Sequence, residues 1–318
     1  MPLHREAGPL LTSREVPALR PDLHDVTSVF NPGATRWRDR EVLLLRVQTR
    51  GRTTLLLPAE FEDGELRFTG PPLAPGIEDP EPSHVYDPRL TVIGDTLYAV
   101  CACDFEEGCA LLTLRTDDFE HWETVGLEAT TDQRNGVLFP EKIGGRYVRF
   151  ERPNLFVPEG GPPTGSAITC SASDDLVEWE RIAVVMEGRP RRWDELIGSG
   201  PPPVKTRDGW LHLYHGVATH FGAANVYQAG VALHDLDEPW RVLHRGAFNI
   251  LEPREPWELT GQVPNVVFPS GMIVERVDGD GFAIDDSPVR VYYGAADTVV
   301  GVASATISEL VRDARFEG

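Results

Sequence analysis

A short stretch of the chain, SHVYDPRLT at 83–91, combines a carboxyl group and a guanidinium in a way that could do chemistry. Asp87 precedes a proline, and Arg89 follows two positions later. Because a residue before proline is biased toward extended backbone, we expect both side chains to project from the same side of one strand. The plainer interpretation is that an aspartate before proline forms a turn.

Three further stretches carry charged side chains beside prolines or at the ends of short apolar runs. They are GVLFPEKIGGRYVRFERPN with Arg149 and Arg152, GSGPPPVKTRDGWLHLYHGV with Lys205 and His215, and VYYGAADT with Asp297. Each residue alone has an ordinary explanation, such as a surface ion pair, a core histidine or a turn cap. Their combination in one predicted site favours a shared function.

Taken together, these side chains are rich in cations and poor in paired acids. An inverting hydrolase needs two carboxyl groups, one to protonate the leaving oxygen and one to activate water. Inorganic phosphate is already an anion and a nucleophile, so a site that uses it needs one acid and several Arg, Lys or His donors. The set therefore favours phosphorolysis, with phosphate as a co-substrate.

Composition narrows the class of protein. The chain has 318 residues, of which 41% are hydrophobic and 25% charged, as is typical of a globular protein. Its formal net charge of -20 argues against nucleic acid as a partner, since phosphate-backbone binding needs a basic surface. No apolar run is long enough to span a bilayer and no secretory signal is visible, so we expect no membrane partner and a cytoplasmic location.

No cofactor is indicated by the residues. The nine histidines are scattered without ligand spacing, and the four cysteines show no metal-binding pattern, so we expect no metal and reduced, structural thiols.

The elements that must position these residues are almost all strands. Short β-rich runs such as EVLLLRVQT and GWLHLYHGV are divided by Gly, Pro and Asp turns. Only the final residues, 305–318, have the pattern of a short amphipathic helix. The sequence predicts an all-β fold.

A repeated segment indicates how the strands are grouped. TDDFEHWETV and SDDLVEWERI share the order Asp-Asp-apolar-x-x-Trp-Glu, with Asp117 and Asp174 lying 57 positions apart, and a looser copy contains Asp235. The same step leads back to the region of residue 60 and forward to 292–298. Five units of about four strands each predict a five-bladed β-propeller with a short C-terminal helix, in which each repeated segment is a turn between outer strands.

We therefore expect one catalytic domain over 1–318, with short N- and C-terminal extensions. A two-sheet sandwich with chance likeness between turns is the alternative. In a propeller the inner strands of all blades converge on one central pocket, so residues far apart in sequence can face a single ligand.

In order and spacing, YDPRLT, GVLFPEKIGGRYVRFERPN, GSGPPPVKTRDGWLHLYHGV, YQAGVALHDLDEP and the GQVPNVVFPSGMIV to VYYGAADTVVGVA region resemble the signature segments of glycoside hydrolase family 130. These are β-mannoside phosphorylases and a minority of related mannosidases. The resemblance extends from about Asn31 to the GAADT segment and implies a five-bladed propeller. It also implies an inverting cleavage of a β-mannoside by phosphate that gives α-mannose 1-phosphate.

The resemblance assigns expected roles to individual residues. Asp87 would be the general acid. The phosphate ligands would be Arg46, Arg152, Lys205 and His215, with Tyr227 as a weaker candidate. The sugar-binding set would comprise Asn31, Arg89, Arg149 and Asp297, with Arg89 also a weaker candidate for the phosphate shell.

Two departures and two rival functions remain open. Tyr86 stands where many members have Glu, and DQRNGVLFPEK differs from the Lys-Asp-containing version of that segment, so the acceptor sugar is undetermined. One rival is an inverting β-mannosidase with Glu141 or Asp297 as its second carboxylate, and the other is a non-catalytic glycan-binding propeller. The expected partners are a small oligosaccharide and phosphate, and the resemblance suggests a homo-oligomer.

Overall fold

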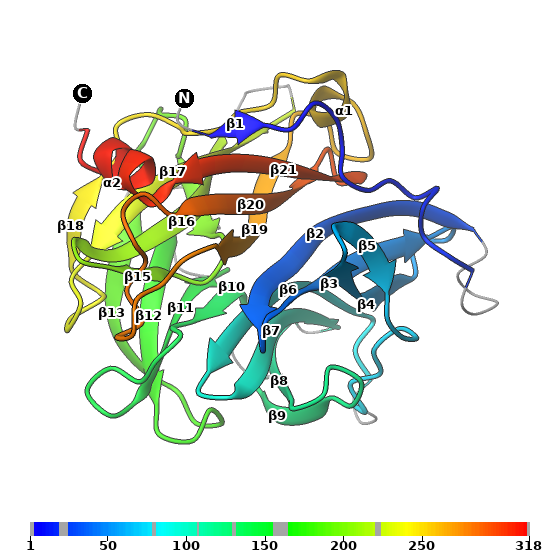
Figure 1. The fold of residues 1–318 in the computed structure, drawn as a ribbon, viewed down its shortest axis with the longest axis horizontal. Coiled ribbons are helices and arrows are strands. Elements are labelled where there is room, and N and C mark those ends of the chain that lie inside the picture. Colours follow the sequence, from blue (N-terminus) through cyan, green and yellow to red (C-terminus); the bar gives the residue numbers. More distant parts are fainter. Residues whose placement is uncertain are drawn as a thin grey trace.

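The strands are grouped in five antiparallel sheets arranged around a central axis, as the computed structural model shows (Figure 1). The structure describes residues 3–18, 25–77, 81–106, 108–128, 132–154, 165–219 and 224–316. The five-bladed propeller predicted from the repeat is therefore confirmed, whereas the assignment of the whole of 1–318 to one domain stays a prediction.

Each of the first four blades is a run of consecutive strands. Blade 1 consists of β2 (Val26–Trp37), β3 (Arg40–Thr49), β4 (Thr54–Glu62) and β5 (Glu65–Phe68). Blade 2 consists of β6 (His84–Ile93), β7 (Thr96–Phe105), β8 (Gly108–Thr116) and β9 (Glu123–Leu127). Blade 3 consists of β10 (Gln133–Leu138), β11 (Tyr147–Pro153), β12 (Ala167–Ser173) and β13 (Glu180–Glu187). Blade 4 consists of β14 (Leu196–Ser199), β15 (Val204–Thr206), β16 (Gly209–Ala218), β17 (Val226–His234) and β18 (Val242–Arg245).

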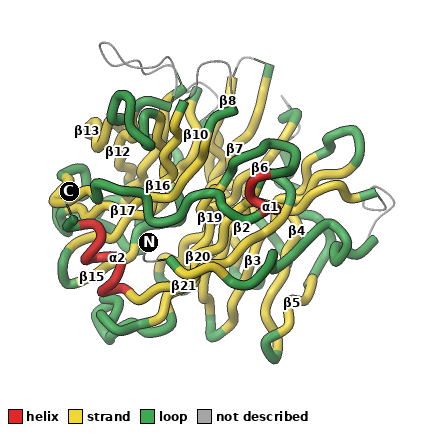
Figure 2. The backbone as a smooth tube through the Cα atoms, turned by 90° about the horizontal axis from the view of Figure 1, so that it is seen from above, coloured by secondary structure: helices red, strands yellow, loops and turns green. Residues whose placement is uncertain are grey.

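The fifth blade closes the ring with strands from both ends of the chain. Its strands are β19 (Val267–Val274), β20 (Pro288–Ala295), β21 (Val299–Thr306) and, as the outermost, β1 (His4–Arg5). Figure 1 shows β1 in blue beside β21 in red. The short helix α1 (Pro256–Leu259) precedes β19, and α2 (Ile307–Ala314) follows β21 and packs beside β17 (Figure 2). Neither helix of the described chain is long and apolar enough to cross a membrane.

The repeated Asp-containing segments lie where the sequence predicts them in four blades. Asp117 follows β8, Asp174 follows β12 and Asp235 follows β17, and the turn at 63–64 joins β4 to β5. For the fifth repeat the prediction of a turn between outer strands is wrong. The turn near Asp297 joins β20 to β21, the second and third strands of its blade. The reason is that the outermost strand of this blade comes from the N-terminus, so its outer pair has no connecting turn.

Apolar residues fill each of the five interfaces between neighbouring blades. For example, Val42 and Leu44 of blade 1 pack with Ala99 and Leu112 of blade 2. Where the inner strands cross, they approach closely: a Cβ at Gly33 would lie 2.8 Å from the carbonyl oxygen of Pro88. This close approach brings the first residues of the inner strands together at one end of the ring.

The contact between β1 and the rest of blade 5 depends on a buried carboxylate. Glu258 is fully buried and accepts a 2.8 Å hydrogen bond from Nε of Arg5 as well as one from the hydroxyl of Tyr293.

Arg5→Ala is expected to lower the free energy of unfolding by about 3 kcal/mol, because a buried carboxylate loses its countercharge. Urea unfolding measures this. Arg50→Ala breaks an exposed pair with Asp25 and should cost less than about 1 kcal/mol; equal losses in the two variants would contradict the role given to Arg5.

Candidate active site

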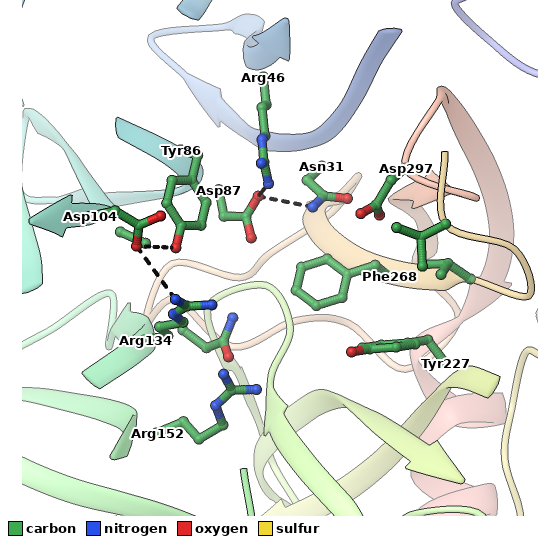
Figure 3. A pocket seen from close by; sticks show the side chains of 14 residues that line it. Asn31, Arg46, Tyr86, Asp87, Asp104, Arg134, Arg152, Tyr227, Phe268 and Asp297 are labelled. Carbon is green, nitrogen blue, oxygen red and sulfur yellow. Dashed lines mark hydrogen bonds and ion pairs between the residues drawn. The ribbon is translucent and has the colours of Figure 1, made fainter. Parts of the chain in front are cut away.

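A cavity of about 320 Å³ opens at the end of the ring where the inner strands begin (Figure 3). Side chains from all five blades or from the segments that join them line it. The lining residues are Asn31, Arg46, Tyr86, Asp87, Ala102, Asp104, Arg134, Asn135, Arg152, Tyr227, Val263, Val266, Phe268 and Asp297. Six of the ten residues predicted for the site therefore lie on one surface: Asn31, Arg46, Asp87, Arg152, Tyr227 and Asp297.

The inner strands of three blades present their polar residues through the same backbone device. Asn31, Asp87 and Asn135 have φ angles of 45°, 53° and 54°, and each lies at a register shift in the pairing of its strand. Asx side chains tolerate this left-handed region better than most others. The prediction that Asp87 is extended is therefore wrong, because a β-bulge between Tyr86 and Arg89 overrides the bias imposed by proline.

The surroundings of Asp87 favour the anionic form of its carboxyl group. Its Oδ1 accepts hydrogen bonds of 2.9 Å from Nδ2 of Asn31 and 2.8 Å from Nη1 of Arg46. Burial opposes ionisation, but the charges of Arg46 and Arg89 and these hydrogen bonds outweigh it and lower the pKa of Asp87.

Asp297, another carboxyl group of the cavity, has a pKa shifted in the opposite direction. Burial, followed by the negative charge of Asp87, raises the pKa of Asp297 to about 6. Asp297 follows β20, and its backbone also lies at positive φ, 50°. Of the three carboxyl groups in this cavity, Asp87 and Asp297 thus differ in proton affinity.

Two arginines face each other on the opposite wall. Arg134 on β10 and Arg152 on β11 are direct cross-strand partners, an arrangement that is destabilising for like charges. Arg134 donates a long hydrogen bond of 3.4 Å to Asp104, and Arg152 donates one of 3.4 Å to Asn154. Burial, followed by the charge of Arg134, lowers the pKa of Arg152. In Figure 3 the hydroxyl of Tyr227 points into the cavity from the other side. The two guanidiniums and this hydroxyl can therefore bind an anion between them.

Beneath the cavity lie His215 and Arg89, which are fully buried and absent from its surface. The imidazole of His215 packs 4.6 Å from Phe268, whose ring also lies 5.2 Å from the guanidinium of Arg89. Burial, followed by the charges of Arg152 and Arg89, lowers the pKa of His215 far below its usual range. These causes favour the neutral imidazole of His215 over the cation expected from the sequence. Arg89 follows the bulge and does not line the cavity, but its charge still lowers the pKa of Asp87.

Two predicted residues lie outside the cavity. Lys205 pairs with Trp210 at the end of β16 opposite to His215, and its Nζ donates a 2.8 Å hydrogen bond to Glu141. Arg149 is fully buried between Glu128 and Glu151 and its guanidinium stacks on Trp179. Neither residue lines the cavity, so the structure contradicts the placement of Lys205 and Arg149 in the site.

Five polar or aromatic lining residues are not among the ten predicted site residues: Tyr86, Asp104, Arg134, Asn135 and Phe268. A signal for Asn135 is present, since Asn-Pro at 31, Asp-Pro at 87 and Asn-Gly at 135 lie in the first half of successive inner strands. Asp104 is tied to the site by the hydroxyl of Tyr86, which donates to it at 2.7 Å. Among the described residues no cluster of His, Cys, Asp or Glu could hold a metal ion.

The chain matches the family model described as beta-1,4-mannooligosaccharide phosphorylase over residues 13–314. It belongs to glycoside hydrolase family 130. The fold and the order of its signature segments agree with this family 130 membership.

Relatives of this family 130 chain include several phosphorylases. It is 35% identical to the beta-1,4-mannooligosaccharide phosphorylase of Ruminococcus albus over 71% of the chain, a match that spans 64% of that enzyme's length. It is 31% identical to the 4-O-beta-D-mannosyl-D-glucose phosphorylase of Bacteroides fragilis over 95% of the chain and 82% of that enzyme. The structure of the beta-1,2-mannobiose phosphorylase from Listeria innocua superposes with a TM-score of 0.84 at 26% identity and covers 99% of both chains.

Proposed function

We propose that this protein cleaves a β-mannoside with inorganic phosphate, with inversion, to give α-mannose 1-phosphate. The observation that carries the proposal is the cross-strand pair Arg134 and Arg152, whose like charges face one cavity with Asp87. A bound phosphate dianion offsets the repulsion between the guanidiniums and is itself the nucleophile, so no carboxylate base is needed for water.

Asp87 donates the proton to the departing glycosidic oxygen in this proposal. Asn31 and Arg46 hold its carboxyl group in place, and Asn31 and Asp297 also bind hydroxyls of the mannose ring. Arg134, Arg152 and Tyr227 hold the phosphate, and neutral His215 supports this subsite from below. Lys205 and Arg149 have no part in it.

The pKa of Asp87 is lowered in the cavity as it is before phosphate binds. Bringing a dianion into the same cavity raises the pKa of a nearby carboxyl group, because a like charge disfavours its ionised form. Binding of the nucleophile therefore helps to convert Asp87 into a proton donor.

The substrate class follows the relatives, and the linkage is left open. The names of the relatives specify β-1,4-mannooligosaccharide, mannosyl-glucose and β-1,2-mannobiose. The partners that we propose are accordingly a small manno-oligosaccharide or mannosyl-sugar and phosphate, without a further cofactor. The homo-oligomer and the cytoplasmic location stay predictions.

A hydrolytic reaction is the second candidate, because Asp87 and Asp297 are two carboxyl groups in one cavity. Glu141 does not serve as the second carboxylate in this alternative, since it pairs with Lys205 and does not line the cavity.

The experiment is to measure cleavage of short β-mannosides as a function of phosphate concentration. We expect no turnover without phosphate, and a rate that rises and saturates as phosphate is added. Turnover that is unchanged in phosphate-free buffer would support hydrolysis, and no cleavage of any β-mannoside under either condition would support a glycan-binding role.

A further inference from the structure

Two of the three carboxyl groups that line the cavity, Asp87 and Asp297, differ in their hydrogen bonds. Asp87 accepts hydrogen bonds from Asn31 and Arg46, both on its Oδ1. The carboxyl group of Asp297, by contrast, makes no hydrogen bond or ion pair with any residue in the described part of the chain. The protein therefore supplies donors for one anion and not for the other.

The amide of Asn31 connects the two groups. Since Asp87 is an acceptor, Asn31 must present Nδ2 to it, which turns Oδ1 to the other side. This Oδ1 is buried and has no donor among the described residues. In Figure 3 the amide of Asn31 lies between the carboxyl groups of Asp87 and Asp297. A protonated Asp297 can donate to an amide oxygen, whereas an ionised Asp297 cannot.

The charged and titratable groups around Asp297 come from three other blades. Asp87 on β6 and Arg46 on β3 act on it with opposite sign, and the hydroxyl of Tyr227 on β17 senses its charge. Burial and Asp87 together outweigh Arg46, which places the pKa of Asp297 at about 6. Two carboxyl groups in one low-dielectric site commonly share a single proton.

We propose that Asp297 and Asp87 form a coupled pair that stores one proton, which resides on Asp297 in the unliganded enzyme and serves the departing oxygen during turnover. The storage follows from the cavity alone, while the use of the proton rests on the proposed function. Asp297 is thus the proton store of the reaction as well as a sugar ligand.

The proton balance of phosphorolysis fits such a store. An oxygen of monohydrogen phosphate forms a bond to the anomeric carbon, the bond from that carbon to the glycosidic oxygen breaks, and the departing oxygen takes the proton of the pair. The new phosphate ester still carries one proton, which returns to the pair. The second pKa of a phosphate monoester is about 6, so this return to Asp297 is close to thermoneutral.

The decisive experiment uses the unliganded protein, labelled with carbon-13 at its aspartate carboxyl groups and titrated from about pH 4 to about pH 9. We expect one carboxyl resonance to titrate near pH 6 and to be absent in Asp297→Asn. In Asp87→Asn its midpoint should fall by about one pH unit or more, because a neighbouring negative charge is removed. Asp104→Asn, which alters another carboxylate of the cavity, should leave the midpoint of this resonance unchanged.

The proposal would be overturned if no aspartate titrated above pH 5, or if the resonance near pH 6 persisted in Asp297→Asn. Because no substrate is present, this result does not depend on whether the enzyme uses phosphate. In the activity arm, Asp297→Asn should remove a titration near pH 6 from the profile of kcat/KM for the mannoside. A uniform loss of kcat/KM at all pH values would instead mean that Asp297 only binds the sugar.

Discussion

Asp87→Asn is expected to lower kcat for a natural β-mannoside by about 10² to 10⁴, the usual contribution of a positioned general acid. Asparagine keeps the shape of the side chain, and it can still contact Asn31 and Arg46, but it has no proton to give to the departing oxygen. Steady-state kinetics at saturating phosphate measure the loss.

The leaving group supplies the control for this variant. A nitrophenyl mannoside departs as a stabilised anion and needs little protonation, so its cleavage should suffer far less in Asp87→Asn. If the natural and activated substrates lost the same factor, Asp87 would not be the acid. Unchanged rates with both substrates would also exclude it from the chemistry.

Arg152→Met should raise the KM for phosphate about 10- to 150-fold, because a hydrogen bond to a charged group contributes about 1.5–3 kcal/mol. The KM for the mannoside should change little. Thermal stability should be retained or rise, since the substitution removes one of two like charges that face each other across β10 and β11. Initial rates over a matrix of both substrate concentrations separate these effects.

Lys205→Met is the matched control, because it removes the same charge from a residue outside the cavity. It should leave the KM for phosphate unchanged within about twofold, because Lys205 is paired with Glu141 outside the cavity. A rise in KM that is larger in Lys205→Met than in Arg152→Met would contradict the placement of the phosphate subsite.

The propeller could be predicted from the sequence because the same turn residues recur at a regular spacing. The Asp-Asp pairs before Trp122 and Trp179 mark the same hairpin in two blades, and the β-rich runs between the turns predict the individual strands. The resemblance to family 130 also singles out Asp87, which lines the cavity, while its role as the general acid stays a prediction.

Which side chains reach the cavity could not be predicted, because this depends on which face of each strand turns inward, on strand pairing and on bulges. Arg149 and Arg152 are three residues apart, so a regular strand turns them to opposite faces, and only Arg152 reaches the cavity. Lys205 and His215 lie near opposite ends of β16, a separation that depends on which residues pair in the hairpin. The bulges at Asp87 and Asn135 insert residues that no periodic pattern anticipates.

The most direct test of phosphate as the attacking group is to run the reaction in water enriched in oxygen-18 with ordinary phosphate, and to analyse the products by mass spectrometry and phosphorus-31 NMR. Direct attack by phosphate predicts α-mannose 1-phosphate whose anomeric oxygen carries no label from the solvent. Free mannose that carries solvent oxygen at its anomeric carbon from the first turnover, without mannose 1-phosphate, would contradict it.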